Sequence, residues 1–322
     1  MILLIGDEID PHLIELRKSI VLNGELCEIF STTRDSLLNT SFYFCSSGDE
    51  ADLAIYQRGK EFFASSIKVA FCMSPMFVME NSFSSQEQKF WFYSWRECLF
   101  GFYSILAERK ALIQSSITLA IENQNKVKFL FVAKRLGLNV PISFIGNSKL
   151  KIHEFLKLKD SNVLKTLHQL QLFYKKEKTM LLTTKVAESD FSKYEEEHQC
   201  PLFLQKFIDK KYDLRLVVIG GDIFAFKIDA TNSVYGAVDW RAYDLPNTIH
   251  EVIDISDDFK SDIRDLMSAL DLEYACIDVC VDNDDSYWVL DVNPFGKYLW
   301  IEKLLGFDLT QKIALYIISR IN

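Results

Sequence analysis

The stretch "YACIDVCVDNDDSYWVLDVNP" (residues 274–294) decides the fold of the second half of the chain, because it reads as a β-hairpin that turns at "DNDD". Asp291 and Asn293 are two positions apart on its second strand, so alternation sends both to one face. Pairing across the turn brings Asp278 of the first strand opposite them, with side chains roughly 5 Å apart. An Asx-type turn that ends the strand before Pro294 is the alternative interpretation of Asn293.

This face gathers two carboxylates and an amide, which predicts a magnesium site. Left empty on a half-buried face, the carboxylates of Asp278 and Asp291 would repel each other and be costly to desolvate. A hard divalent cation removes that cost, and Mg²⁺ is usually held by one or two carboxylates together with substrate phosphates. The set Asp278, Asp291 and Asn293 therefore also predicts a nucleotide.

Lysines upstream of the hairpin are candidates for contacts with the phosphates. Lys165 lies in the apolar strand-like segment "NVLKTL" (162–167), and Lys206 and Lys227 are further candidates. A solvent-facing position is the alternative for each. Lys227 in particular alternates with apolar neighbours as an ordinary residue of an edge strand would.

Composition excludes several classes of protein. The chain has 322 residues, enough for two or three domains, and is 49% hydrophobic. Its net charge of −9 argues against binding nucleic acid. Because it lacks an apolar run of the ~20 residues that a membrane helix needs, we expect no membrane span. The start lacks the basic region of a signal peptide. The seven cysteines are scattered without a CxxC pair, which indicates a reducing cytoplasm, and the histidine spacing does not suit zinc.

The order of elements predicts an α/β protein with three parts. A buried strand, "MILLIG", precedes an amphipathic helix, and "LCEIF" and "ADLAIYQR" are expected as further strands of a parallel sheet. An aromatic-rich helix or helix pair follows at 87–113. We place the boundaries to give an N-terminal α/β domain (1–118), a small β-rich central lobe (119–205) and a C-terminal lobe with an antiparallel sheet (206–322). Helices are expected at 125–137, 257–270 and 308–321, and a hairpin over Gly220–Gly221.

Several motifs, taken in order, resemble the ATP-grasp fold. They are "NK…A…LGLNVP", "VLK", "FLQKFI", "DLRLVVIGGDIFAFKID" and "IDV…WVLDVNPFG". The chain is most similar to the peptide-maturase branch of that superfamily, the graspetide ligases of the microviridin and grasp-with-spasm type. Its "IYQRG" (55–59) is similar to their "WYRRG", and its "VDWRAYD" (238–244) to their "DWR" element.

The resemblance implies a role for each candidate residue. Asp278, Asp291 and Asn293 would bind Mg²⁺, and Lys126 and Lys165 would reach the phosphates of ATP. Other residues implied to bind the cofactor are Lys227 and the segment that offers backbone groups to adenine: Gln205, Lys206, Phe207 and Ile208. Residues implied to hold the acceptor carboxylate or its acyl phosphate are Asp213, Arg215 and Arg241. The chain departs from the family pattern twice. A glycine-rich phosphate loop is absent after Lys165, and Lys297 stands where glutamine is expected after Gly296.

The implied activity is ATP-dependent crosslinking of a peptide. A side-chain carboxylate of a ribosomal precursor peptide, made of leader and core, would form an acyl phosphate that a Ser or Thr hydroxyl or a Lys amine displaces. Such chemistry needs positioning and charge neutralisation rather than a protein nucleophile. The alternatives are a RimK-like ligase that adds an amino acid to a peptide or small acid, and a non-catalytic nucleotide-binding protein. A cytoplasmic enzyme, compatible with a homodimer, is expected.

Overall fold

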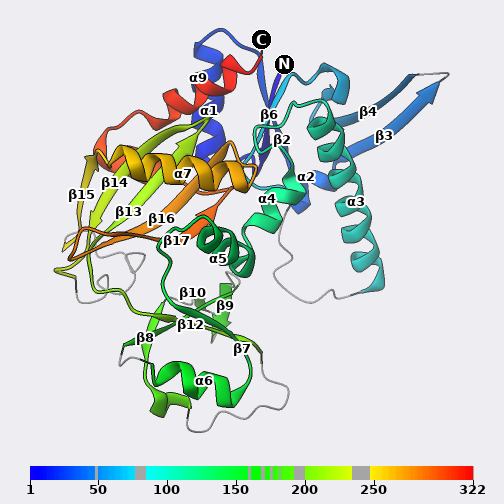
Figure 1. Cartoon of the computed structure of the whole chain (residues 1–322). Coiled ribbons are helices and arrows are strands. Elements are labelled where there is room, and N and C mark those ends of the chain that lie inside the picture. Colours follow the sequence, from blue (N-terminus) through cyan, green and yellow to red (C-terminus); the bar gives the residue numbers. More distant parts are fainter. Residues whose placement is uncertain are drawn as a thin grey trace.

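The structure is a computed structural model that describes residues 1–47, 50–76, 85–158, 161–167, 171–174, 177–180, 183–191, 200–233 and 247–321. Figure 1 shows that these residues form an upper region around the two ends of the chain, a broad sheet with α7 in front of it, and a small lobe below. None of the helices in these ranges combines the length and apolar character needed to cross a membrane.

The N-terminal region contains the expected parallel sheet. Strands β1 (Ile2–Gly6), β2 (Cys27–Ser31) and β6 (Val69–Cys72) run parallel in the order β2-β1-β6. Helix α1 (Pro11–Leu22) begins at its cap Asp10 and buries Leu13, Leu16 and Ile20. The expected first strand and amphipathic helix are thus confirmed.

The "ADLAIYQR" segment does not join this sheet, so that prediction was wrong. It forms β4 (Glu50–Gln57) of a separate antiparallel sheet with β3 (Thr40–Ser47) and β5 (Lys60–Phe63). The turn from β4 to β5 consists of Arg58 and Gly59, both with positive φ (54° and 76°). Two such residues make the tight turn of an antiparallel hairpin, whereas a parallel connection needs a long crossover. Nearby helices are α2 (Arg34–Leu37), the 3₁₀ turn η1 (Ala64–Ser66) and the long α3 (Gln86–Glu108).

The small lobe is a four-stranded antiparallel sheet with its own core. Its order is β11-β8-β12-β7, from β7 (Ser143–Gly146), β8 (Asn162–Lys165), β11 (Thr184–Val186) and β12 (Leu202–Lys206). Helix α6 (Lys149–Leu156) and the 3₁₀ turn η2 (Glu188–Phe191) complete it. The core consists of Ile152, Phe155, Leu156, Phe191 and Leu204. A separate two-stranded ladder joins β9 (Gln171–Tyr174) to β10 (Glu177–Met180).

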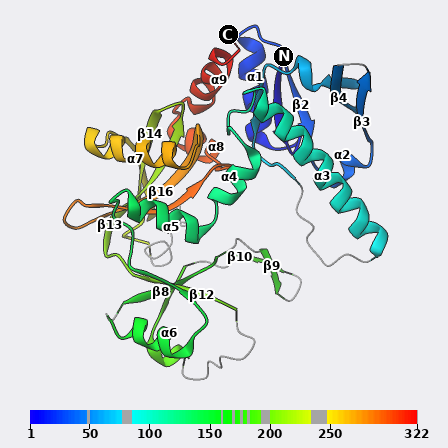
Figure 2. The same ribbon diagram turned by 45° about the vertical axis from the view of Figure 1, so that its right-hand side comes forward.

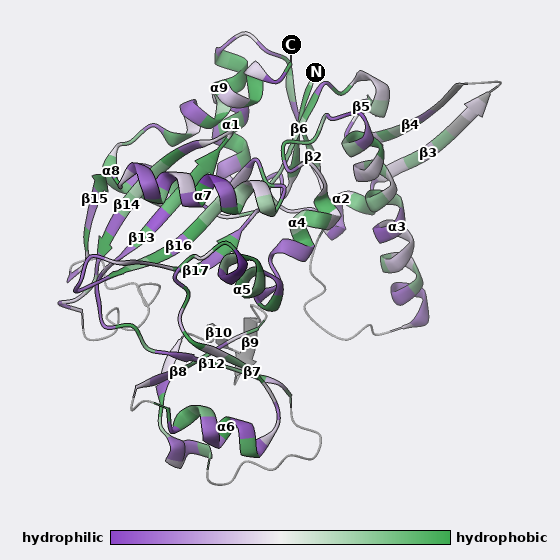
Figure 3. Cartoon of the chain, viewed as in Figure 1, coloured by the Kyte–Doolittle hydropathy of each residue, from purple (hydrophilic) through white to green (hydrophobic). Residues whose placement is uncertain are grey.

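The C-terminal sheet is antiparallel, as expected, with the order β15-β14-β13-β16-β17. Its strands are β13 (Lys210–Ile219), β14 (Asp222–Asp229), β15 (Ile249–Ile253), β16 (Tyr274–Asp282) and β17 (Tyr287–Asn293). The predicted hairpins over Gly220–Gly221 and over "DNDD" are both present. Helix α7 (Asp257–Ala269) buries Phe259, Ile263, Leu266 and Met267. In Figure 3 α7 is mixed purple and green, as expected of a helix with one face on a sheet.

Two connections tie the parts together. Helix α5 (Lys126–Arg135) packs beside β17 and α7, and α4 (Ile117–Asn123) packs on α5 and α3, so part of the expected central lobe belongs spatially to the C-terminal sheet. After α8 (Leu299–Leu305), helix α9 (Leu309–Ser319) returns to pack on α1. Figure 2 shows the small lobe set apart beneath this assembly. The division at 118 and 205 remains a prediction.

Candidate active site

Three neighbouring strands carry the candidate acidic and basic residues to one face. Arg215 of β13 lies opposite Asp278 of β16, and Asp278 lies opposite Asp291 of β17. Asp213 and Asn293 are each two residues from a member of this row, so they share its face. The juxtaposition expected from alternation in the hairpin is therefore present.

A β-bulge sets this alignment. Asp278 pairs with Asp291, but the next residue, Val279, pairs with Val289, which leaves Leu290 as an extra residue on β17. A bulge of this kind re-aims the side chains beside it and is common next to active sites. Alternation alone could not predict it.

Arg215 is buried, at 7% exposure. Its Nη1 donates to Asp278 Oδ1 at 2.7 Å, and its Nη2 donates to the carbonyl of Lys297 at 3.1 Å. Its Nε is buried, and no described residue provides it with a hydrogen-bond acceptor. A buried donor without an acceptor costs about 1–3 kcal/mol. The guanidinium therefore keeps an N–H group whose hydrogen-bonding capacity the described residues leave unused.

Asp213 is also buried, at 3% exposure, but it does not pair with Arg215. Lys210 Nζ donates to Asp213 Oδ2 at 2.6 Å. Asp213 and Arg215 are therefore not an exposed ion pair, because both are buried and each has a different partner. Lys210 was not singled out in the sequence, where it reads as one of two adjacent lysines in a solvated turn.

Helix α5 and the residue that caps α4 contact the acidic row from the other side. Lys126 at the start of α5 forms an ion pair with Asp291, and Gln124 Nε2 donates to Asn293 Oδ1 at 3.0 Å. Asn293 Oδ1 also accepts the backbone N–H of Phe295 at 3.0 Å, which is the Asx-type turn. Both interpretations of Asn293 thus involve the same oxygen. Sequence reasoning missed Gln124, whose only signal is its place in the polar break "ENQNK" between two helices.

The residues fit a bound Mg²⁺ by the chemistry of their donors. Two carboxylates on directly opposite positions are each neutralised here by a cation, Arg215 for Asp278 and Lys126 for Asp291. Oxygen donors of this kind suit Mg²⁺ with phosphate oxygens completing its shell. The side-chain oxygen Oδ1 of Asn293 already accepts two hydrogen bonds. For this oxygen to bind the metal, Gln124 would have to release it. No three or more His, Cys, Asp or Glu side chains gather as a metal site within the described ranges.

Lys165 faces the C-terminal sheet from the small lobe. Burial raises the pKa of the Cys280 thiol on β16 to about 12; Asp213 raises it as well, while Lys210 and Lys165 lower it. Lys165 therefore acts electrostatically on the strand that carries Asp278. Its ammonium also lies 5.9 Å from the centre of the Phe203 ring. A contact of Lys165 with the phosphates stays a prediction.

The segment expected to contact adenine joins the two lobes. Gln205 is buried and donates to Ser143 Oγ at 2.9 Å, and Lys206 Nζ donates to Asn162 Oδ1 at 2.7 Å and to the carbonyl of Phe155 at 3.0 Å. These two side chains point into the small lobe. Phe207 and Ile208 follow β12 and lead into β13. The backbone N–H groups of Lys206 and Phe207 are bonded to Ile142 and Ser161.

Lys227, one of the predicted residues, does not join this cluster. Lys227 lies opposite Leu214, so it is on the sheet face away from Asp213 and Arg215. There it lies 3.4 Å from Glu251 and 3.7 Å from Asp229. Arg241 and the "VDWRAYD" motif lie outside the described residues.

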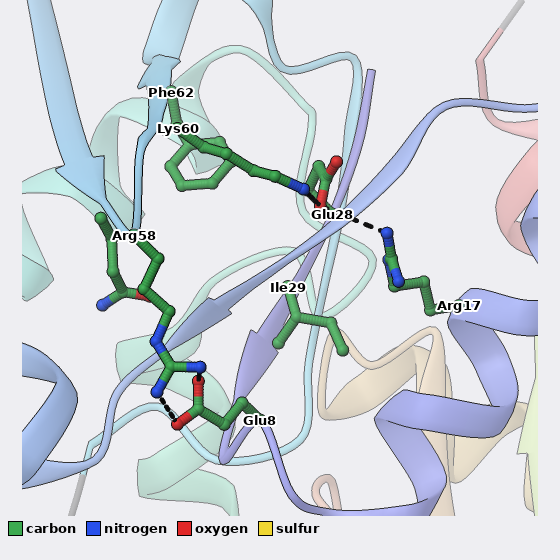
Figure 4. A pocket seen from close by; sticks show the side chains of 8 residues that line it. Glu8, Arg17, Glu28, Ile29, Arg58, Lys60 and Phe62 are labelled. Carbon is green, nitrogen blue, oxygen red and sulfur yellow. Dashed lines mark hydrogen bonds and ion pairs between the residues drawn. The ribbon is translucent and has the colours of Figure 1, made fainter.

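A separate cavity of about 210 Å³ lies in the N-terminal region and includes part of the "IYQRG" motif. In Figure 4 Arg58 points to Glu8, while Lys60 and Arg17 both approach Glu28. The charges drawn there are paired with one another. The cavity is therefore distinct from the acidic row, where the Nε of Arg215 lacks an acceptor within the described part of the chain.

Comparison with known proteins supports the ATP-grasp fold expected from the sequence. A family model described as a RimK-like ATP-grasp domain matches residues 123–317, more than half of the chain. The RiPP-associated ATP-grasp ligase of Chryseobacterium gregarium, in complex with ADP and a leader and core peptide, has a TM-score of 0.84 at 20% identity, with 99% of this chain and 96% of that chain covered. No curated protein sequence is significantly similar to the chain.

Two further solved structures are alike over nearly the whole chain. Macrocyclase MdnC from Microcystis aeruginosa, bound with precursor peptide MdnA, has a TM-score of 0.82 at 22% identity and covers 99% of this chain and 100% of its own. The ATP-grasp ligase PsnB, complexed with a minimal precursor, Mg and ADP, has a TM-score of 0.74 at 18% identity, with coverages of 99% and 98%. Identities this low speak to fold, and they confirm the ATP-grasp fold expected from the sequence.

Proposed function

Because the chain belongs to the RimK-like ATP-grasp family, we propose that it is a ligase that uses ATP to join carboxylates to hydroxyl or amine groups within one peptide. The proposed substrate is a ribosomally made precursor peptide with a leader and a core. The product carries ester or amide crosslinks between Asp or Glu and Ser, Thr or Lys side chains.

The observation that carries this proposal is the state of Arg215. Its guanidinium is buried beside the acidic row, held by Asp278 and by the Lys297 carbonyl, while its Nε lacks an acceptor among the described residues. A planar guanidinium can hold a carboxylate through two parallel hydrogen bonds. Arg215 is thus suited to orient a substrate carboxylate and to stabilise the charge of its acyl phosphate.

The chemistry proceeds in two balanced steps. A carboxylate oxygen of the peptide attacks the γ-phosphorus of ATP, the bond from that phosphorus to the β–γ bridging oxygen breaks, and ADP leaves. A hydroxyl or amine of the same peptide then attacks the acyl carbon, inorganic phosphate leaves with the bonding electrons, and the nucleophile loses its proton. The residues that we assign to the phosphates are Lys126 and Lys165. Mg²⁺ held by Asp278, Asp291 and Asn293 would neutralise phosphate charge.

The peptide substrate is supported by similarity rather than by the site itself. Ligases of this fold that resemble the chain over nearly its whole length are described with precursor, leader or core peptides. The "VDWRAYD" motif points to the same branch. We also propose a cytoplasmic location, in keeping with the six free cysteines that the structure describes.

The test is incubation of the protein with ATP, Mg²⁺ and a short peptide rich in Thr, Lys, Asp and Glu that is encoded beside its gene. Mass spectrometry should show products lighter by one water per crosslink, with ADP formed. A parallel reaction in EDTA should give no product. If the peptide instead gains the mass of an added amino acid when free amino acids are supplied, the RimK-like alternative is correct. If ATP is bound but no carboxylate is activated with any peptide or amino acid, the proposal of a ligase fails.

A further inference from the structure

The loop that follows Asn293 is held from the N-terminal region by His12. The Nε2 atom of His12 lies 3.1 Å from the backbone nitrogen of Tyr298 and 3.0 Å from that of Leu299. Both partners are N–H donors, so Nε2 must be the unprotonated nitrogen. Nδ1 lies 2.8 Å from Asp10 Oδ1 and therefore carries the proton that the neutral ring donates to this carboxylate. The contacts select one tautomer of a neutral imidazole.

The same loop holds Arg215 on its other side. The carbonyl of Lys297, next to the two N–H groups bound by His12, accepts the hydrogen bond from Arg215 Nη2 at 3.1 Å. The Lys297 ammonium forms an ion pair with Asp10. Gly296 accepts a 2.6 Å hydrogen bond from the buried Tyr274 hydroxyl, and a side chain at Gly296 would collide with Cys276. A shift of residues 297–299 would therefore move the carbonyl that orients the guanidinium.

We propose that His12 is a positioning residue, which fixes the 297–299 backbone from α1 and, through the Lys297 carbonyl, aligns Arg215. The inference deepens the function proposed above, in which Arg215 holds the substrate carboxylate. His12 itself touches neither the acidic row nor Arg215. The N-terminal region thereby helps to complete the site of the ATP-grasp lobes, through hydrogen bonds to the 298–299 backbone and the ion pair of Asp10 with Lys297.

Protonation of His12 should undo this alignment. An imidazolium would present an N–H at Nε2 to two further N–H groups, so both hydrogen bonds would be lost. The charged and titratable groups that face the ring are Asp10 on α1 and Lys297 and Tyr298 on the loop; the Tyr298 ring centre lies 5.1 Å away, edge-on. Behind Tyr298, Glu302 of α8 is bonded to Thr310 of α9. Burial would raise the pKa of Asp10, but hydrogen bonds from His12 and Lys297 outweigh it and hold that pKa below its usual value, so Asp10 stays a carboxylate at mildly acidic pH.

The experiment compares His12→Ala, His12→Gln and the control Ser19→Ala. Gln can offer an uncharged oxygen near the position of Nε2, whereas Ala offers none. Ser19 lies on the same helix and donates to Gln311 of α9 at 2.6 Å, so its loss tests general loosening of the α1 contact without touching the loop. The first readout needs no substrate: hydrogen exchange of the amides of Tyr298 and Leu299, and the nitrogen-15 side-chain signal of Arg215 in NMR spectra.

We expect faster amide exchange and a shifted or broadened Arg215 signal in His12→Ala. Both should stay near wild type in His12→Gln and in Ser19→Ala. The second readout is the rate of peptide crosslinking against pH. His12→Ala should lower kcat/KM about 10- to 100-fold, because loss of a residue that orients a functional group from behind commonly costs this much. Wild type should lose activity where His12 becomes protonated, and His12→Gln should lack that step in its pH profile.

The two readouts separate failure of this inference from failure of the proposed function. If the Arg215 signal and the two amides are unchanged in His12→Ala, the positioning role is wrong, whatever the activity. If they change as expected but no protein crosslinks any peptide, the positioning role stands and the proposed function is wrong. Equal changes in His12→Ala and Ser19→Ala would show that His12 only holds the domains together, which also overturns the inference.

Discussion

The two sheets that border the site direct their charged side chains differently. In the C-terminal sheet, Arg215 and Asp291 contact partners from other elements, Asp278 and Lys126, across the face where we place the nucleotide. In the small lobe, the ammonium of Lys206 turns inward to Phe155 and Asn162 of its own sheet and helix. Lysines drawn from one set of motifs therefore divide into those that face the site and those that hold a lobe together. The direction of a side chain, rather than its presence in a motif, separates the two.

Asp291→Asn should have the largest effect on the C-terminal side of this comparison. It removes one of the two carboxylate charges in the row, so we expect turnover to fall on the order of 1,000-fold while the protein remains folded. The measurement is crosslinking at saturating peptide, together with the unfolding midpoint. Asp284→Asn, in the exposed turn of the same hairpin, is the matched control and should leave turnover unchanged. Wild-type turnover in Asp291→Asn would remove Asp291 from the proposed metal site.

Arg215→Lys should come next, because it keeps the charge and removes the planar fork. Crosslinking should fall at least ~100-fold, while the affinity for ATP stays within a few-fold. Calorimetric ATP binding and single-turnover crosslinking would measure the two quantities. Arg264→Lys, on the exposed side of α7, is the control. Equal losses in binding and turnover would move Arg215 to the nucleotide half of the site, and no loss in either would make it structural.

Lys206→Met tests the other side of the comparison and should act on stability. It leaves Asn162 Oδ1 and the Phe155 carbonyl without this buried donor, which should cost about 1–3 kcal/mol in the free energy of unfolding. Chemical denaturation would measure the change. Lys157→Met, an exposed lysine after α6 in the same lobe, should cost much less. A loss of ATP affinity without loss of stability would instead give Lys206 a direct role in binding.

Lys227→Ala should have the smallest effect, because Lys227 lies on the opposite face of the sheet. We expect ATP affinity and turnover within about twofold of wild type and a stability change of about 1 kcal/mol or less, as for other partly exposed ion pairs. The same calorimetric and crosslinking assays measure it. A tenfold weaker ATP affinity would contradict the placement of Lys227 outside the site.

Much of the fold was predictable where a local pattern carries the information. Alternation in residues 274–293 predicted the hairpin and the shared face of Asp278 and Asp291, and the two glycines at 220–221 predicted its neighbour. What could not be predicted depends on partners distant in sequence. The bulge at Leu290 has no composition of its own, and β4 reads as a strand whether its partners run parallel or antiparallel to it.

The same limit applies within the site. Alternation along a strand puts Asp213 and Arg215 on one face, but it cannot show that Arg215 pairs with Asp278 while Asp213 pairs with Lys210. Gln124 was missed because an amide between two helices has no periodic signal. The pattern around Lys227 predicts a strand, but only the register of that strand shows which face of the sheet Lys227 occupies.

The closeness of Gly296 to Cys276 makes the Cys276 thiol a probe of movement in the loop after Asn293. The Cys276 sulfur lies 3.9 Å from the Lys297 carbonyl oxygen and is sealed beneath the loop, where burial raises the pKa of its thiol. Because the sulfur is buried, we expect an alkylating reagent to reach it only when the loop moves away. In a variant that keeps Cys276 as its only cysteine, the rate of alkylation would therefore report how often the loop moves. A lower rate on addition of peptide or nucleotide would show that this ligand holds the loop in place.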